Sequence, residues 1–337
     1  MRPYFFLLLT SGLLLFSGCS PKQYFEPKQT HAISQIKSHY SGTIVHKSHH
    51  GATLDNGHYI DKKGISRITL EAGFHFLNEN RKYILAGNKD GTLALIDKKR
   101  GKVKKRIELH EIVVSASIKN GLIAYILGNN TFGLYRLRDG KKLIENHAEH
   151  TYAIDSGMAD PLFIDSIVVV PMLDGKLIIF DTDDTEAAKV IYLSGKKVFN
   201  NIIFLLRAGN TLVAATPKKL LALGTDKEFY HHANIAEVAV YRGHIYLFTK
   251  EGEIVKLNTK LKRLAKKKFR FAKFSAATVI GGTIYVLDMQ GSLIVTDTKL
   301  KQSKVYDVGK VKSPVFISGN KLYKDGKIIR LDALGYK

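Results

Sequence analysis

The feature that most constrains the fold is a strand–turn–strand unit that recurs along the chain from residue 42 onward. Its clearest copies share two runs of β-branched, aliphatic and aromatic residues around a turn ending in glycine, and they lie at 83–97, 167–181, 244–258 and 283–297. Glycine supplies the positive φ that a tight hairpin turn requires. The Asp or Asn that closes each copy can bond the backbone of the next turn. The unit is therefore read as a β-hairpin.

Weaker copies of the unit fill the intervals, so that eight hairpins follow one another at spacings of about 34 to 43 residues. The weaker copies lie at 52–61, 122–137, 211–223 and 322–331. In the copy at 122–137, the pattern places the turn at 129–133.

Further strands accompany the hairpins. A third strand follows most of them, at 102–109, 189–193 and 303–308, and an apolar strand precedes the next, at 112–118, 238–241 and 277–280. Four short strands in about 40 residues indicate one blade of a β-propeller, and helical periodicity is lacking. We therefore expect an all-β chain with a single propeller domain of four-stranded blades over residues 41–337.

The number of blades depends on which segment completes the last one. A blade cannot bury both faces alone, so blades stack in a ring, and closing the ring removes exposed edges. The last hairpin ends at Leu331 without an outer strand. The segment 33–39 would supply that strand in an eight-bladed ring, and 65–70 in a seven-bladed ring. We favour eight blades and keep seven as the alternative.

The amino terminus has the pattern of an export signal. Arg2 precedes an apolar stretch over residues 4–16, which suits a signal peptide and is too short to span a bilayer comfortably. The following Phe16-Ser17-Gly18-Cys19 resembles the lipobox of bacterial lipoproteins, with Phe16 in place of the usual Leu. The resemblance implies that residues 1–18 are removed and that Cys19, the only cysteine, is lipidated and acylated, for example with palmitate. An ordinary secretory signal with a chance cysteine is the alternative.

The segment after Cys19 is polar and contains Pro21 and Pro27, so residues 19–40 are expected to form a lipidated tether between membrane and propeller. Ser20, next to Cys19, is similar to the sorting signal of outer-membrane lipoproteins. We therefore expect an outer-membrane protein, lipid-anchored on the periplasmic side, with exposure at the cell surface left open.

The sharp repeats resemble those of quinoprotein-like (PQQ-repeat-type) propellers, and 83–102, with Asp90-Gly91 and Arg100-Gly101-Lys102, is the best match. Among lipid-anchored members, the chain resembles the BamB-like subunit of the outer-membrane β-barrel assembly machine. The resemblance implies a scaffold that binds envelope proteins, with the barrel-assembly complex as the expected partner, as a monomer or as part of a hetero-complex. Quinoprotein enzymes hold their cofactor with a tryptophan and commonly a vicinal disulfide. The chain has no tryptophan and one cysteine, so we expect no enzyme activity and no cofactor.

The formal net charge of +22 favours acidic partners. Two basic runs stand out, near residues 98–106 and 260–273, and they supply the candidate partner-binding residues Lys98, Lys99, Arg100, Lys104, Lys105, Lys266, Lys267, Lys268 and Arg270. The alternation Phe269-Arg270-Phe271 predicts a half-buried strand, so the plainer interpretation is solvated charge on turns and outer strands. Export makes nucleic acid an unexpected partner. The alternative function is a binding module for anionic polysaccharide or extracellular matrix.

Metal sites are not expected either. Neighbouring side chains on a strand point to opposite faces, so the pairs His49-His50 and His231-His232 do not readily share one ion. The acidic run from Asp181 to Glu186 lacks the glycine of a calcium loop and predicts a solvated turn.

Overall fold

The structure is a computed structural model that describes residues 23–33, 38–149, 151, 157–193, 200–225 and 227–337. The predicted signal peptide and the predicted lipidation site at Cys19 lie outside the described residues. No helix among the described residues is long and apolar enough to cross a membrane.

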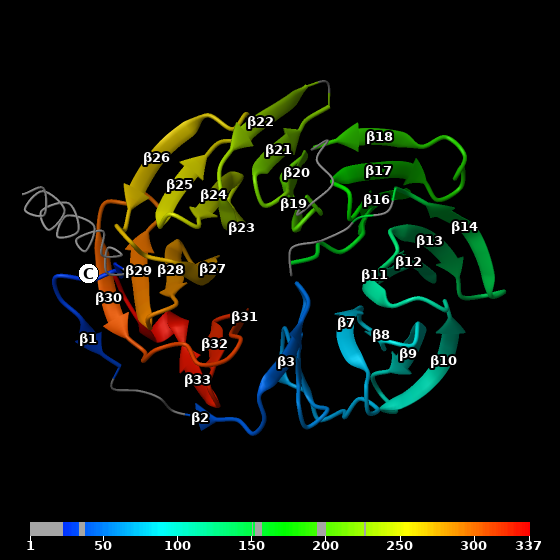
Figure 1. The fold of residues 1–337 in the computed structure, drawn as a ribbon, viewed down its shortest axis with the longest axis horizontal. Helices are drawn as coiled ribbons and strands as arrows, with labels where there is room; N and C mark the ends of the chain where they lie inside the picture. Colours follow the sequence, from blue (N-terminus) through cyan, green and yellow to red (C-terminus); the bar gives the residue numbers. More distant parts are fainter. Residues whose placement is uncertain (1–22, 34–37, 150, 152–156, 194–199, 226) are drawn as a thin grey trace, which may run out of the picture.

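Eight four-stranded sheets follow one another around a ring (Figure 1). We number them as blades in chain order and count the strands of each from the centre outward. Blades 1 to 4 contain, in that order, β3 (Ile44–Lys47), β4 (Ala52–Leu54), β5 (Tyr59–Asp61) and β6 (Gly64–Ile65); β7 (His75–Glu79), β8 (Tyr83–Gly87), β9 (Thr92–Asp97) and β10 (Lys102–Glu108); β11 (Val113–Lys119), β12 (Leu122–Leu127), β13 (Thr131–Arg136) and β14 (Lys141–His147); β15 (Leu162–Ile164), β16 (Ile167–Pro171), β17 (Lys176–Asp181) and β18 (Lys189–Tyr192).

The second half of the ring repeats this order. Blades 5 to 8 contain β19 (Phe204–Ala208), β20 (Thr211–Ala215), β21 (Lys219–Leu223) and β22 (Glu228–His232); β23 (Ile235–Tyr241), β24 (His244–Thr249), β25 (Glu253–Leu257) and β26 (Arg263–Lys268); β27 (Phe274–Ile280), β28 (Thr283–Asp288), β29 (Ser292–Asp297) and β30 (Ser303–Asp307); β31 (Phe316–Ser318), β32 (Lys321–Lys324), β33 (Lys327–Arg330) and, from the amino-terminal segment, β2 (Ser38–His39). A short 3-10 helix, η2 (Leu331–Ala333), follows β33.

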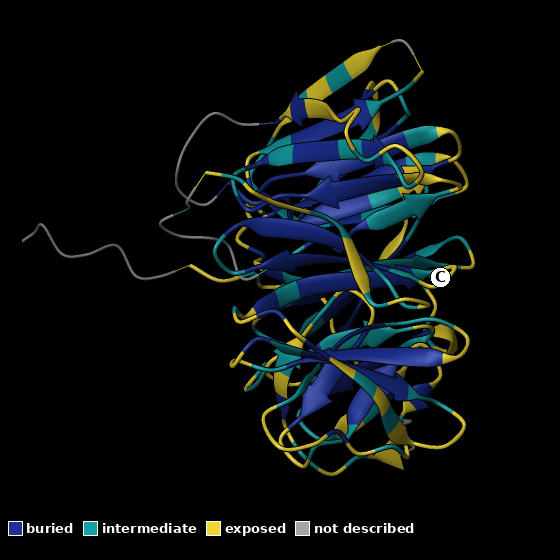
Figure 2. Cartoon of the chain, turned by 90° about the vertical axis from the view of Figure 1, so that its right-hand side faces the viewer, coloured by how far each residue is buried: buried dark blue, intermediate teal, exposed yellow. Residues whose placement is uncertain are grey.

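The eight hairpins expected from the sequence are the second and third strands of the eight blades. The all-β propeller and its four-stranded blades are thus confirmed, and the count is eight. The sequence periodicity finds these two strands best because they are the most deeply buried of each blade. Figure 2 shows this distribution, with buried strands inside the ring and exposed turns at its surfaces.

The ring closes through the amino-terminal segment. Strand β2 pairs antiparallel with β33, with Ser38 opposite Ile328, and completes blade 8. Upstream of it, β1 (His31–Ala32) adds a parallel fifth strand to the outer edge of blade 7. Part of the segment 19–40 therefore lies on the propeller.

Packing between neighbouring blades forms the core. Each interface buries aliphatic and aromatic side chains from the facing sheets. Between blades 1 and 2, for example, the ring of Tyr59 stacks on that of Phe76, with centroids 4.9 Å apart. Burial of such large side chains is the main stabilising contribution in a chain with a single cysteine.

Two local predictions are wrong. The turn expected at 129–133 spans only 128–130, and Gly133 lies inside β13, where it faces the ring of Tyr125 on β12. The expected strand at Phe269-Arg270-Phe271 is the connection from blade 6 to blade 7, because β26 ends at Lys268 and Phe271 has a φ of +64°. Alternation of apolar and basic residues in this connection reflects one buried and one exposed aromatic ring.

Candidate functional site

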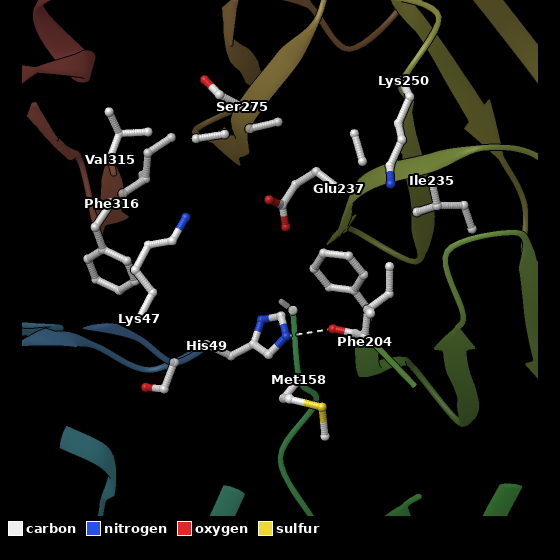
Figure 3. Close-up of a pocket in the computed structure, with 17 residues that line it drawn as sticks. Lys47, His49, Met158, Phe204, Ile235, Glu237, Lys250, Ser275, Val315 and Phe316 are labelled. Carbon is white, nitrogen blue, oxygen red and sulfur yellow. Dashed lines mark hydrogen bonds between the residues drawn. The ribbon is translucent and has the colours of Figure 1, made fainter. Parts of the chain in front are cut away.

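A cavity of about 390 Å³ lies in the central channel of the ring. It is lined by residues of blades 1, 5, 6, 7 and 8, together with Met158, which precedes blade 4 (Figure 3). Its polar side chains include Lys47, His49, Glu237 and Lys250. The inner strands therefore supply charged groups as well as apolar ones to the channel.

The turn between β3 and β4 carries one of these groups across the channel. Nε2 of His49 lies 2.6 Å from the carbonyl oxygen of Ile203 in blade 5, which is opposite blade 1 in an eight-bladed ring. The imidazole also meets the ring of Phe204 edge to face, with centroids 4.9 Å apart. Surrounding protein lowers the pKa of His49, although its side chain remains open to the cavity. A neutral ring that donates from Nε2 fits both observations.

The neighbouring His50 reaches a different blade. Its Nε2 lies 3.3 Å from a carboxylate oxygen of Asp160, in the segment that enters blade 4. The other oxygen of Asp160 accepts a hydrogen bond of 2.5 Å from the hydroxyl of Ser115 in blade 3. Burial raises the pKa of Asp160, and the two histidines oppose that rise. One turn of blade 1 thus contacts blade 5 and the entry to blade 4, and Asp160 connects it to Ser115 of blade 3.

Glu237 on the inner strand β23 points its carboxyl group into the cavity, between the amines of Lys47 and Lys250 (Figure 3). Enclosure by the protein raises the pKa of Glu237 to about 8, and Lys47 opposes the rise. The carboxyl group therefore changes its protonation state near neutral pH. The channel can present either a carboxylate or a neutral donor to a small polar group.

Two further histidines stack beside the channel. His46 of β3 and His75 of β7 have ring centroids 4.8 Å apart at an interplanar angle of 15°. Burial, with repulsion from His75, lowers the pKa of His46 to about 4, and burial also lowers the pKa of His75. Both rings are consequently neutral at pH 7.

The first basic run lies on the outer part of blade 2, in β10 and the turn before it. Lys98 belongs to the fold: its side chain is 18% exposed, its ammonium pairs with the carboxylate of Glu79, and it donates to the carbonyl of Asn80 at 3.0 Å. Lys99 and Arg100 are exposed at the turn tip.

The lysines on β10 itself lie against tyrosine rings. Lys104 donates to the hydroxyl of Tyr83 at 2.6 Å, and the ammonium of Lys105 lies 5.1 Å from the ring centroid of Tyr135. The bond from Lys104 lowers the pKa of Tyr83.

The second basic run lies on β26 of blade 6 and on the connection after it. Lys266 and Lys268 flank the carboxylate of Glu253 at 2.8 and 3.5 Å. Lys267 donates to the hydroxyl of Ser303 in blade 7 at 2.9 Å, and the guanidinium of Arg270 lies 4.7 Å from the ring centroid of Phe271. Blades 2 and 6 are opposite each other, so the structure separates the two runs (Figure 1).

The candidate metal ligands have other neighbours. The carboxylate of Asp181 accepts hydrogen bonds from the hydroxyl of Ser166 at 2.6 Å and from the amide of Asp183 at 2.9 Å. These bonds are typical of a turn. His231 and His232 alternate along the outer strand β22. Within the part of the chain that the structure describes, no three His, Cys, Asp or Glu side chains are grouped to hold a metal ion.

Comparison with known proteins finds relatives by sequence and solved structures with a similar fold. No protein-family model matches the chain. The chain is 29% identical over 314 residues to the plasminogen-binding protein PgbB of Helicobacter pylori strain J99, covering 79% of this chain and 58% of the relative. PgbB of strain 26695 is 29% identical over 306 residues, covering 77% and 56%. The chain thus spans little more than half the length of these curated relatives.

Among solved structures, BamB from Moraxella catarrhalis superposes with a TM-score of 0.67 at 16% identity, covering 86% of this chain and 98% of that one. The fold is that of a BamB-like β-propeller. The carboxy-terminal WD40 domain of Sif2 also superposes, with a TM-score of 0.63 at 14% identity, covering 90% and 99%. Since such different propellers match at low identity, these likenesses concern the fold alone.

Sequence reasoning did not find the channel residues. In the sequence, His49 and His50 form only a pair of loop histidines, and Asp160 and Glu237 stand in segments without a motif. The shortness of the hairpin at 52–61 was the one local irregularity near the turn that crosses the channel.

Proposed function

We propose that this chain is a lipid-anchored envelope scaffold whose propeller binds other proteins, a role that requires no chemistry of its own. The observation that carries the proposal is the similarity, over 79% of the chain, to proteins named for binding plasminogen. A propeller fold suits such a role because its edges and faces are broad and rigid. Removal of residues 1–18, lipidation of Cys19 and attachment to the outer membrane belong to the same proposal, on the periplasmic side for an envelope partner and at the cell surface for a partner outside the cell.

The docking surface we propose is the basic edge of blade 2. Lys99, Arg100, Lys102 and Lys104 are exposed along this edge. Lys82 adds a further ammonium, 5.3 Å from the ring centroid of Tyr83. These cations would attract an acidic protein surface and accelerate its association.

Plasminogen is the first partner to test. Binding of the lipidated protein, held in a nanodisc, is measured by interferometry and compared with the variant Lys99→Glu/Arg100→Glu/Lys104→Glu. The matched control, Lys189→Glu/Lys301→Glu/Lys327→Glu, makes the same charge change at exposed lysines of other blades. We expect the edge variant to lose about tenfold or more in affinity and the control to lose less than about threefold. Equal losses in both would remove the edge of blade 2 as the docking surface.

A role in outer-membrane protein assembly is the second candidate, favoured by a superposition that covers 98% of BamB from Moraxella catarrhalis. Crosslinking in intact cells followed by mass spectrometry, with Cys19→Ala for comparison, tests it. Links to barrel-assembly proteins that disappear in the variant would support this role. Links to anionic polysaccharide alone, weakening steeply above about 0.15 M salt, would replace both candidates with polymer binding.

A further inference from the structure

We propose that the basic and aromatic end of blade 6 rests on the headgroups of an anionic phospholipid membrane, and that the lipid anchor and this surface act together. The membrane edge, as we call it, consists of Lys268, Arg270, Phe271 and Lys273. The proposal rests on the proposed lipidation of Cys19 and adds an orientation of the propeller to it.

The amino-terminal segment is docked at the membrane edge. The ring of Phe25 meets that of Phe269 edge to face, with centroids 5.8 Å apart, and packs against the core between blades 6 and 7. Gln23 lines a hollow of about 550 Å³ together with the four residues of the membrane edge. The amino-terminal segment therefore first contacts the propeller at blade 6 and then continues to pair with blades 7 and 8.

The docking limits how far the anchor can lie from this surface. Gln23 follows Cys19 by four residues, and a fully extended chain spans at most about 3.6 Å per residue. Cys19 consequently lies within about 14 Å of Gln23. A tether without contacts up to residue 40 would allow the propeller any orientation relative to the membrane. Because Phe25 contacts Phe269, only the residues between Cys19 and Phe25 separate the anchor from blade 6.

The chemistry of the membrane edge suits a lipid interface. Lys268, Arg270 and Lys273 are exposed cations, and Glu251 is the acidic side chain that lines the same hollow. Glu251 is bonded by the side-chain amide of Asn234. Basic residues near a membrane are attracted to anionic headgroups, and a second signal strengthens a lipid anchor.

Phe271 provides the apolar part of this surface. It is 38% exposed, in the connection after β26, and its backbone has a φ of +64°. Aromatic rings at the level of the headgroups are common in membrane-bound proteins. The guanidinium of Arg270 lies 4.7 Å from the centroid of this ring, so cation and ring are presented together.

The absence of tryptophan from the chain permits a direct test. Phe271→Trp places a single tryptophan at the membrane edge. Leu264→Trp is the matched control, because Leu264 is 51% exposed and lies near the opposite end of the same strand, β26. Each lipidated variant is reconstituted into phosphatidylcholine vesicles containing about 30% phosphatidylglycerol, with brominated phosphatidylcholine as quencher.

We expect brominated lipid to reduce the fluorescence of Trp at 271 at least twofold and to leave Trp at 264 unchanged. Adding Lys268→Glu/Arg270→Glu/Lys273→Glu should abolish the quenching at 271 while the protein still floats with the vesicles. Equal quenching at both positions, or none at 271 in protein that floats, overturns the orientation. Protein that lacks the lipid by mass and fails to float overturns the anchor itself, and the orientation with it.

Discussion

Replacement of Gly133 by alanine tests how the blades are packed. Gly133 faces Tyr125 across the β12–β13 pair. A Cβ added at Gly133 would lie 2.9 Å from Cε1 of Tyr125 and closer still to Cζ and Oη. The tyrosine ring must therefore move by about 1 Å to restore an ordinary contact distance.

Tyr125 has little freedom to make that movement. It is fully buried in the core between blades 2 and 3, and its hydroxyl bonds the carboxylate of Glu145. Overpacking costs about 1–3 kcal/mol, and disturbing this bond adds about 1 kcal/mol. We therefore expect Gly133→Ala to lower the free energy of unfolding by about 2–4 kcal/mol. A fall in Tm of roughly 3–6 °C corresponds to this loss in a domain of about 300 residues.

Thermal and denaturant unfolding followed by circular dichroism give the measurement. Gly224→Ala is the control, because its nearest neighbour to an added Cβ is the carbonyl oxygen of Lys227 at 3.6 Å. A double-mutant cycle with Tyr125→Leu isolates the overlap, since the smaller side chain removes the ring that the new methyl group meets. A Gly133→Ala variant within about 0.5 kcal/mol of the wild type, or strictly additive effects in the cycle, would refute the reasoning.

Three further predictions concern the channel and the ring closure. In the native state the pKa of His46 is about 4, whereas in the unfolded chain it is near 6.5. Acid therefore protonates the unfolded chain first, and this histidine should lower the free energy of unfolding by at most about 3 kcal/mol as the pH drops from 7 to 4. His46→Gln should flatten this pH dependence in denaturant titrations, and an unchanged slope would contradict the assignment. Ser115→Ala leaves the buried Asp160 without its hydroxyl donor and should lower the free energy of unfolding by about 1–3 kcal/mol. Asp160→Asn loses only the ion pair with the half-exposed His50 and should cost less. Calorimetry that gives the reverse order would contradict this network. Tyr40→Ala removes an edge-to-face contact with Tyr323 at 5.8 Å and should accelerate hydrogen exchange in β33, whereas Tyr192→Ala, at an exposed ring, should not; protection of β33 in both variants would show that the ring closes without this contact.

The sequence by itself determined the repeating unit of this protein. Hairpin signals are local, because a turn glycine and the alternation of side chains act within a dozen residues. The hairpins 83–97 and 244–258 could therefore be placed almost to the residue as β8–β9 and β24–β25. The same local reasoning failed at Gly133, because this glycine is not in a turn but leaves space for the ring of Tyr125 on the neighbouring strand.

Only the tertiary structure decided how the units are joined. The segments 33–39 and 65–70 were both able to supply the last outer strand, and the pairing of Ser38 with Ile328 selects the first. The contact between His49 and Ile203 joins residues 154 positions apart across the channel. The two basic runs look equivalent in sequence but lie on opposite blades, and Phe25 brings the amino terminus to one of them. These relations depend on closure of the ring, which fixes distances between residues that no local interaction connects.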